Sequence, residues 1–402
     1  MSLPRSFLAS VWLLTVLGLP ATPLAACTTA IISGKATPDG RPILWKNRDT
    51  PEAHNIVVRC EDGRYPYLGT ANGGDPGGLQ IWSGVNAAGF AIMNNASYNL
   101  ATRGEDSTQE GTLMKLALQS CATVADFQGL LERSAGKGRS VAANFGVIDA
   151  QGGAAYFETD EKGFHRFDAA EAPGGFLVRG NYSHSGKRGA GSGYLREARA
   201  QELLSGIQSR HRLTVAVLLA EVVRDTANAR IHSFPAQTRQ GFAYVGDSIN
   251  RNGNSNGTAN AFVVQGVRPG EAPGLSTAWV ILGQPITGVA VPLWVEAGPI
   301  PPELAGHEPM APLHAAFDRV RRHIYPDHEE DRFRYLEASR VYDPARGLLP
   351  PLLALERQNL EEVAKAEGLP NLDRRALETG ITRSTLDRVL KLLEQQQVPA
   401  EK

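Results

Sequence analysis

The sequence predicts an α+β protein built from largely antiparallel sheets, with a helical extension at its C-terminal end. Short β-branched and apolar segments separated by turns occupy residues 28–94, and two helical segments follow them. Strand-like segments return over residues 143–179 and 242–295, with another helical pair between them. Most links between strands are short enough for hairpins, which favours antiparallel pairing and a layered α+β domain.

The first strand pair is a hairpin that begins at Cys27. Thr28 to Ser33 is β-branched and apolar, and Pro42 to Asn47 resumes this pattern after the turn Thr37-Pro38-Asp39-Gly40. In such a turn Pro presets φ at the second position and Gly tolerates the last. Further strands are predicted at Asn55 to Cys60, Gly78 to Gly84, Gly89 to Asn94, Ala143 to Ile148, Ala154 to Glu158, Phe176 to Arg179, Phe242 to Ile249, Ala259 to Val267, Thr277 to Leu282 and Val289 to Val295.

Helices are predicted where apolar residues recur at helical spacing behind a capping residue. Ser107 and Glu110 have the capping-box spacing ahead of the first helix, and Thr123 is the expected N-cap of the second. The remaining helices are predicted at Tyr194 to Ile207, Thr214 to Arg224, Leu353 to Glu367 and Arg375 to Gln397.

The composition changes after the proline-rich segment 298–302. We therefore expect one domain over residues 27–300 and a charged helical extension over residues 301–402. Charged helical tails are usually solvated packing layers and sometimes oligomer contacts. We assign this one no chemistry, and the oligomeric state stays open.

Residues 1–26 have the pattern of an export signal. Arg5 precedes an apolar run from Phe7 to Leu19, and small residues follow, ending in Ala25-Ala26. The run is shorter than the ~20 apolar residues that a spanning helix needs, and its flanks match a secretory signal peptide. No later stretch is long and apolar enough to cross a bilayer. The sequence thus predicts a secreted or periplasmic protein with no membrane span.

The charge and histidine patterns argue against two other classes of partner. The chain has 41 basic and 42 acidic residues and no basic stripe, so we expect no nucleic-acid binding. None of its histidines forms an H-E-x-x-H motif, and His323 with His328 makes a poor zinc pair without further ligands. We expect no metal and no other cofactor.

The chain has three cysteines, Cys27, Cys60 and Cys121. In an oxidising compartment an odd number of cysteines indicates a free, reactive thiol. Cys60 and Cys121 could form a disulfide and leave Cys27 alone, or they could be two buried, unpaired thiols. Both arrangements stay open.

Cys27 has two competing interpretations. If the signal is removed just before it, one residue carries both a thiol and a free α-amine, which is a complete nucleophile-and-base pair. An α-amine titrates near ~7.7 and a thiol near ~8.5, so neither needs a large pKa shift at neutral pH. Alternatively, Leu24-Ala25-Ala26-Cys27 fits a lipid-attachment site. Lipidated cysteines normally precede a flexible polar tether, whereas Cys27 leads directly into a strand, which favours the nucleophile.

Several segments together resemble a known family. They are CTTAIISGKATPDGRPILWKNRD from Cys27, GVNAAGFAIMNN from Gly84, NFGVIDAQGGAAYFETD from Asn144, RGNYS from Arg179 and LGQPITGVAVPLWV from Leu282. Their order and spacing resemble the N-terminal-nucleophile (Ntn) hydrolases that cleave linear amides, and most closely the isopenicillin N acyltransferase-like branch. The resemblance implies an αββα four-layer sandwich and an amidohydrolase or acyltransferase that cleaves a C–N bond in a small amide through an acyl-thioester.

The resemblance also assigns candidate site residues by position. Where relatives usually have Arg, this chain has Lys46, with Arg48 two residues on, so both residues are candidates for the cation beside the nucleophile. Without the resemblance, each residue has a plainer interpretation as a turn, loop or surface residue. The assignments are Cys27 as nucleophile, Asp49 as the acid that contacts the α-amine, Lys46 as the nearby cation, Asn181 as an oxyanion donor, Asn95 (or its neighbour Asn94) as a second site amide, and Arg251 as a site arginine.

One further motif, around Ser255, formally fits another class of hydrolase. Residues 253–257 read G-x-S-x-G around Ser255, the pattern of a serine-hydrolase elbow. Such an elbow lies between a strand and a helix, whereas strand-like segments flank this one on both sides, so we expect a hairpin tip. Three questions stay open: which acyl group and amine the protein recognises, whether it catalyses hydrolysis or acyl transfer, and whether Cys27 is exposed by a signal peptidase or by self-cleavage.

Overall fold

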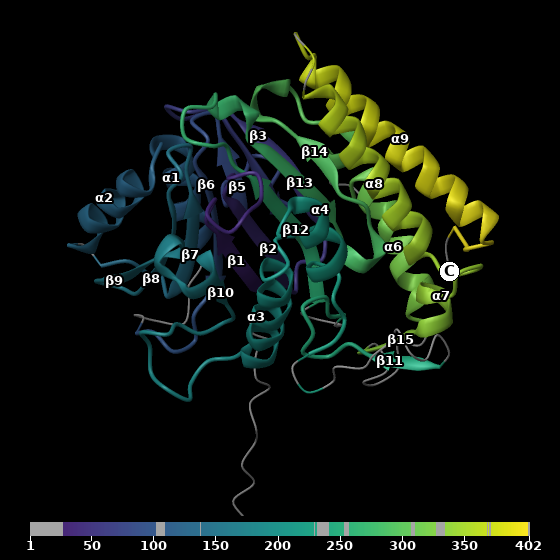
Figure 1. Ribbon diagram of the computed structural model, residues 1–402, viewed down its shortest axis with the longest axis horizontal. Helices are drawn as coiled ribbons and strands as arrows, with labels where there is room; N and C mark the ends of the chain where they lie inside the picture. The colour runs from purple at the N-terminus through teal and green to yellow at the C-terminus, as the bar shows by residue number, and fades with distance from the viewer. Residues whose placement is uncertain are drawn as a thin grey trace, which may run out of the picture.

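A computed structural model gives the fold of the chain (Figure 1). The structure describes residues 27–101, 109–136, 138–228, 230, 241–252, 257–306, 310–326, 334–367, 369 and 371–400. The predicted export signal, the Ser107 cap, the Ser255 motif and His328 lie outside these residues.

Two antiparallel sheets pack face to face at the centre of the molecule (Figure 1). The first sheet has six strands in the order β10-β1-β2-β12-β13-β14. Its strands are β1 (Thr28–Ile32), β2 (Ile43–Thr50), β10 (Phe176–Arg179), β12 (Gly257–Gln265), β13 (Thr277–Leu282) and β14 (Val291–Leu293).

The second sheet has seven strands, which follow one another in chain order from β3 to β9. All of its strand pairs are antiparallel. Its strands are β3 (Asn55–Cys60), β4 (Tyr67–Asn72), β5 (Ser83–Asn86), β6 (Ala91–Ala96), β7 (Ala143–Ile148), β8 (Ala154–Thr159) and β9 (Phe164–Asp168).

Helices cover the outer face of each sheet, so the layers run helix, sheet, sheet, helix (Figure 1). Two of them, α1 (Gln109–Ser120) and α2 (Val124–Ala135), pack on the second sheet. This architecture confirms the predicted α+β class and the αββα sandwich. The other helices are α3 (Tyr194–Gln208), α4 (Val215–Val217), α5 (Pro302–Ala305), α6 (Pro312–Ile324), α7 (Ala338–Tyr342), α8 (Leu349–Ala366) and α9 (Arg374–Gln395), and a short ribbon pairs β11 (Phe242–Tyr244) with β15 (Tyr335–Glu337).

The β1–β2 hairpin lies inside this sandwich. Thr28 pairs with Asn47 and Ile32 pairs with Ile43, so the hairpin has the predicted position. All residues of both strands are buried, because the facing sheet covers one side and helices cover the other. Cys27, the first residue that the structure describes, is therefore held against the end of β2 by a fully packed element.

Three predicted elements are wrong in extent, and the sequence pattern does not predict three of the strands. The strand expected at Gly78 to Gly84 begins only at Ser83, because turns occupy the glycine-rich segment before it. The strand expected at Phe242 to Ile249 ends at Tyr244, since Asp247 has a left-handed φ of 56° that an extended strand does not allow. The helix expected at Thr214 to Arg224 is the short α4 followed by a π-helix, Leu218–Val222. The strands that the sequence pattern does not predict are β4, β9 and β15, the last of which lies within the segment expected to be helical.

The C-terminal helices are part of the core. Residues of α8 and α9 such as Leu352, Ile381 and Val389 are buried in the same apolar cluster as the first sheet. A buried ion pair adds to this packing: Glu356 on α8 lies 2.5 Å from Arg224 and accepts a 2.7 Å hydrogen bond from the backbone N–H of Ala290. The extension is thus a structural layer of the sandwich rather than a solvated tail.

We expect Glu356→Ala to destabilise the fold strongly. Both partners of the ion pair are almost fully buried, with side chains 2% exposed, so the exchange leaves the Arg224 guanidinium without its counter-charge. Breaking a buried pair from one side costs about 3–5 kcal/mol. Urea unfolding measures this free energy, and Glu362→Ala, at an exposed position of the same helix, is the matched control. A loss below that of the control would contradict the structural role of the pair.

Within the part of the chain that the structure describes, no helix combines the length and the apolar character that crossing a membrane requires.

Candidate active site

Cys27 lies directly before β1 and is 6% exposed. Its Sγ is 3.8 Å from the backbone carbonyl oxygen of Asp49, near the end of β2. The antiparallel register places the two residues together, since Thr28 pairs with Asn47 and the chain ends of the two strands meet there. The thiol therefore faces the end of β2, where Lys46, Arg48 and Asp49 are found.

Asp49 is a buried carboxylate with a cation beside it. Its Oδ1 accepts a 2.7 Å hydrogen bond from the hydroxyl of Thr258 on β12, and its Oδ2 lies 3.0 Å from Nε of Arg251. Burial raises the pKa of Asp49, while the charges of Arg251 and Arg196 act in the opposite direction. Asp49 and Arg251, far apart in the sequence, thus form one ion pair next to Cys27.

Lys46 projects from β2 toward the second sheet. Its ammonium donates to the side-chain oxygen of Asn94 and to the backbone carbonyl of Trp82, each at 2.7 Å. Burial lowers the pKa of Lys46 to about 8, and the charge of a nearby Cys27 thiolate opposes this shift. Lys46 thus carries a positive charge at neutral pH, held by two fixed acceptors.

Arg48 is a second cation near the thiol. Its guanidinium donates to the side-chain oxygens of Asn55 and, at 2.8 Å, of Asn72, and it stacks 4.6 Å from the ring centre of Trp82. Burial lowers the pKa of Arg48 to about 10, again against the charge of a Cys27 thiolate. The structure therefore brings both candidate cations of the sequence motif to Cys27, rather than one of them.

Asn181 follows β10 and is completely buried. Its side-chain nitrogen donates to the carbonyl of Ala96 at 3.0 Å, and its oxygen accepts from Nη2 of Arg196 at 2.8 Å. The same guanidinium donates through Nε to the hydroxyl of Thr28 at 3.2 Å. Arg196 thus connects Asn181 to the residue that follows Cys27.

Asn95 and Asn94 are neighbours on β6 and have different partners. Asn95 accepts a 3.2 Å hydrogen bond from the hydroxyl of Thr29 and donates to the carbonyl of Gly180. Asn94 instead bonds to Lys46. The two-residue period of a strand explains the split, because successive side chains point to opposite faces. Asn94 thus bonds to a cation whose charge acts on Cys27, whereas Asn95 bonds to Thr29, two residues after Cys27.

The structure adds two residues that the sequence did not indicate. Arg196 comes from α3 and is 2% exposed; burial lowers its pKa, while the charges of Asp49 and Cys27 act to raise it. Tyr98 follows β6. Its pKa is raised, mainly by burial and to a smaller extent by the charge of Cys27. Neither lies in a motif, and the helical pattern around Arg196 gives no local sign that this arginine faces inward.

Cys60 and Cys121 are free thiols in the structure, as is Cys27. Burial raises the pKa of both, that of Cys121 to about 11. The described residues contain no group of three or more His, Cys, Asp or Glu side chains arranged to hold a metal ion.

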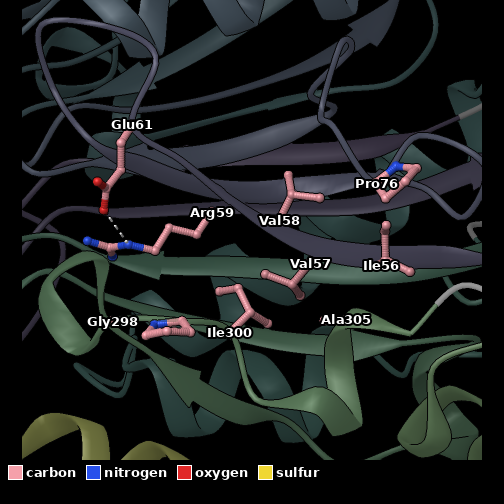
Figure 2. A pocket seen from close by; sticks show the side chains of 10 residues that line it. Ile56, Val57, Val58, Arg59, Glu61, Pro76, Gly298, Ile300 and Ala305 are labelled. Carbon is pink, nitrogen blue, oxygen red and sulfur yellow. Dashed lines mark hydrogen bonds and ion pairs between the residues drawn. The ribbon is translucent and has the colours of Figure 1, made fainter.

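A cavity of about 390 Å³ lies away from the candidate site, beside the edge strand β3 (Figure 2). Apolar side chains including Val58 and Ile300 form its walls, and the Arg59–Glu61 ion pair, at 3.4 Å, lies at one end. None of the candidate site residues lines this cavity.

Comparison with known families gives one match. Residues 36–234 match the family described as acyl-coenzyme A:6-aminopenicillanic acid acyl-transferase. The matched segment includes Lys46, Asp49, Asn95 and Asn181, whereas Cys27 precedes it and Arg251 follows it. A search of curated proteins finds no similar sequence.

Solved structures with a similar course of the chain have low sequence identity to it. A conjugated bile acid hydrolase from Clostridium perfringens is 11% identical with a TM-score of 0.39, and 64% of this chain covers 89% of that one. Penicillin V acylase from Agrobacterium tumefaciens is 12% identical with a TM-score of 0.40 (67% and 85% covered). The Caenorhabditis elegans orthologue of N-acylethanolamine-hydrolyzing acid amidase is 14% identical with a TM-score of 0.37 (62% and 94%).

Proposed function

The chain belongs to the acyl-coenzyme A:6-aminopenicillanic acid acyl-transferase family, whose members are Ntn-type acyltransferases and amidohydrolases, and we propose that it cleaves a C–N bond in a small amide with Cys27 as N-terminal nucleophile. The observation that carries the proposal is the position of Cys27. The thiol lies directly before the buried strand β1 and faces the end of β2, with Lys46, Arg48 and the Asp49–Arg251 pair.

In the first half-reaction, the α-amine of Cys27 takes the thiol proton, directly or through a water molecule. The thiolate attacks the amide carbonyl carbon, and the carbonyl oxygen becomes an oxyanion. Collapse of this tetrahedral intermediate breaks the C–N bond, and the α-ammonium returns the proton to the leaving amine. An acyl-thioester on Cys27 remains.

In the second half-reaction, water loses a proton to the α-amine and attacks the thioester carbonyl. The acid is released and the thiol regains its proton. An amine in place of water would give acyl transfer by the same steps, so the outcome depends on which nucleophile reaches the thioester.

The surrounding residues have complementary roles in this proposal. Asp49 attracts and orients the α-ammonium, and Arg251 holds the Asp49 carboxylate in place. The free N–H of Asn181 donates to the oxyanion, since its other N–H is used by Ala96. Lys46 contributes positive charge near the developing negative charge.

We further propose that the protein is exported and that removal of residues 1–26 exposes Cys27. The rival interpretation, a lipid anchor at Cys27, requires the residue to reach a bilayer through an exposed segment. Burial of Cys27 at 6% exposure and the immediate start of β1 favour the nucleophile over the anchor.

Mass spectrometry of the protein purified from its native host tests this proposal. We expect an intact mass of a chain that begins at Cys27 with a free amine. A panel of penicillins, N-acyl amino acids, short peptides and lipid amides is first screened for an amide that the protein cleaves. On incubation with an excess of that substrate, the intact mass of the protein should rise transiently by the mass of the acyl group. A diacylglyceryl adduct or an uncleaved chain would overturn it.

A further inference from the structure

Glu110 is a buried acid that the proposed reaction does not use. It lies in the first turn of α1 and is 3% exposed. Acids in first helical turns commonly stabilise the helix dipole from an exposed position, but Glu110 points at the second sheet instead. There its Oε2 accepts a hydrogen bond from the side-chain nitrogen of Asn94.

Asn94 connects this acid to Lys46. Its side-chain oxygen accepts the 2.7 Å hydrogen bond from the Lys46 ammonium, and its side-chain nitrogen donates to Glu110. An asparagine amide has its acceptor on one side and its donors on the other. With a cation on one side and a carboxyl oxygen on the other, only one of its two orientations satisfies both partners.

We propose that Glu110 is a positioning residue for the reaction at Cys27: through Asn94 it fixes the Lys46 ammonium beside the thiol. The inference rests on the proposed function of Cys27. If the acid is removed, the buried Asn94 nitrogen is left without its carboxyl partner, and the amide side chain can move to reach another acceptor. Its oxygen then no longer meets Lys46, which leaves the ammonium with the carbonyl of Trp82 as its remaining acceptor.

The charge states of the two residues depend on each other. Burial raises the pKa of Glu110 to about 8 and lowers that of Lys46 to about 8, and each charge opposes the shift of the other. The charged groups that also act on Lys46 are Cys27, Arg48 and Asp49.

The sign of the pH dependence follows from these pKa values. Below pH 8 Glu110 is neutral and Lys46 is charged, so the pair contributes one positive charge to the site. As pH rises through 8 the pair loses protons and this net charge disappears. An ionised Glu110 raises the pKa of Lys46, so a neutral substitute should make Lys46 lose its proton at lower pH.

Two substitutions at Glu110 distinguish the effect of its hydrogen bond to Asn94 from the effect of its charge on Lys46. Glu110→Gln keeps an acceptor for Asn94 and resembles the neutral acid, so we expect kcat within about twofold of the parent at pH 6.5–7. The alkaline limb of the pH profile of kcat should move to lower pH, because Lys46 loses the support of an ionised acid. Glu110→Leu removes the acceptor, and we expect about a tenfold lower kcat, as a displaced site group produces. Lys46→Arg should move the alkaline limb upward, because a guanidinium keeps its proton.

A double-variant comparison tests the role of Asn94. Glu110→Leu combined with Asn94→Leu should lower kcat no further than Asn94→Leu alone, since both exchanges interrupt the same connection. Gln109→Leu, at the exposed position beside Glu110, is the matched control and should leave kcat and its pH profile unchanged. Additive losses, or an alkaline limb unmoved by Glu110→Gln, would overturn the positioning role.

Alkylation of Cys27 by iodoacetamide gives a readout that needs no turnover. The thiolate is the reacting form and the Lys46 ammonium attracts it, so Glu110→Leu should slow alkylation at pH 7 several-fold, with the modified cysteine located by peptide mass analysis. Unchanged alkylation in Glu110→Leu overturns the inference. If Cys27→Ala instead keeps amide cleavage, the proposed function fails, and the alkylation rates still decide the connection between Glu110 and Lys46.

Discussion

Replacement of Cys27 by Ala or Ser is expected to abolish amide cleavage, lowering kcat by about 10⁴-fold or more, as loss of a catalytic nucleophile does in other acyl-transfer enzymes. Alanine removes the attacking atom. Serine keeps a nucleophile, but its hydroxyl has a far higher pKa than a thiol, and an α-amine is too weak a base to activate it to the same extent. The loss of kcat is measured from initial rates with the panel amide that the parent protein cleaves.

The control for this experiment is a cysteine elsewhere in the same chain. Cys121 is buried in the apolar cluster between the second sheet and its helices, and its thiol has a raised pKa. Cys121→Ala should therefore leave kcat close to that of the parent. Thermal unfolding of the Cys27 variants should match the parent within a few degrees. Cleavage retained by a folded Cys27→Ala variant would show that another residue is the nucleophile.

The part of the site near Cys27 was predictable because it depends on one local element. A turn at residues 37–40 joins two strands, and antiparallel pairing then brings Lys46 to Asp49 back toward Cys27. The short connection between the two strands limits this register, and a shift by one residue would move every side chain of a strand to its opposite face. Strand geometry alone does not distinguish Lys46 from Arg48 as the cation near the thiol, because residues two apart in a strand share a face.

Residues from other layers could not be placed from the sequence. Arg196 bonds to Thr28 across a separation of 168 residues, and the contact exists only because α3 packs against the first sheet. The spacing of Glu110 from Ser107 predicts a helix cap, and that spacing contains no information about Asn94. Local patterns predict elements, whereas these contacts depend on how the layers are stacked.

The incorrect strand at Phe242 to Ile249 illustrates a second limit. Its apolar residues read as a continuous strand, but Gly246 and Asp247 turn the chain, and Asn250 reaches the interior instead. The side-chain oxygen of Asn250 accepts from the backbone N–H of Ile286 at 2.9 Å. This turn also sets the position of Arg251, which pairs with Asp49. The site therefore depends on an irregular segment whose backbone the residue pattern did not indicate.

Asn181→Asp is expected to lower kcat by about 10²- to 10³-fold, with a smaller change in KM. The exchange is close to isosteric, and an aspartate oxygen can still accept from Arg196 at the place of the asparagine oxygen. The side-chain N–H groups are lost, however, and a negative charge takes their place where the oxyanion develops. Loss of one oxyanion-hole donor alone has an effect of this size.

Arg196→Lys changes how the Asn181 side chain is held in place without changing that side chain itself. A lysine has no planar fork and cannot bond to Asn181 and Thr28 in the same geometry. We expect a smaller loss than for Asn181→Asp, and in the double variant a loss well below the product of the two single effects, because both act on one donor. Arg210→Lys, at an exposed position just after α3, is the control.

Steady-state kinetics of these four variants, with unfolding curves for each, decide between two roles of Asn181. If Asn181 stabilises the oxyanion, kcat of the folded Asn181→Asp variant falls much further than kcat of Arg196→Lys, whatever free energy of unfolding the lost bond to Ala96 costs. If Asn181 serves only to connect the segment after β10 to Ala96 and Arg196, the loss appears in stability instead, and Arg196→Lys should be as damaging as Asn181→Asp. A kcat within threefold of the parent in a folded Asn181→Asp variant would remove Asn181 from the proposed mechanism and leave the backbone N–H groups near Cys27 as the donors to test.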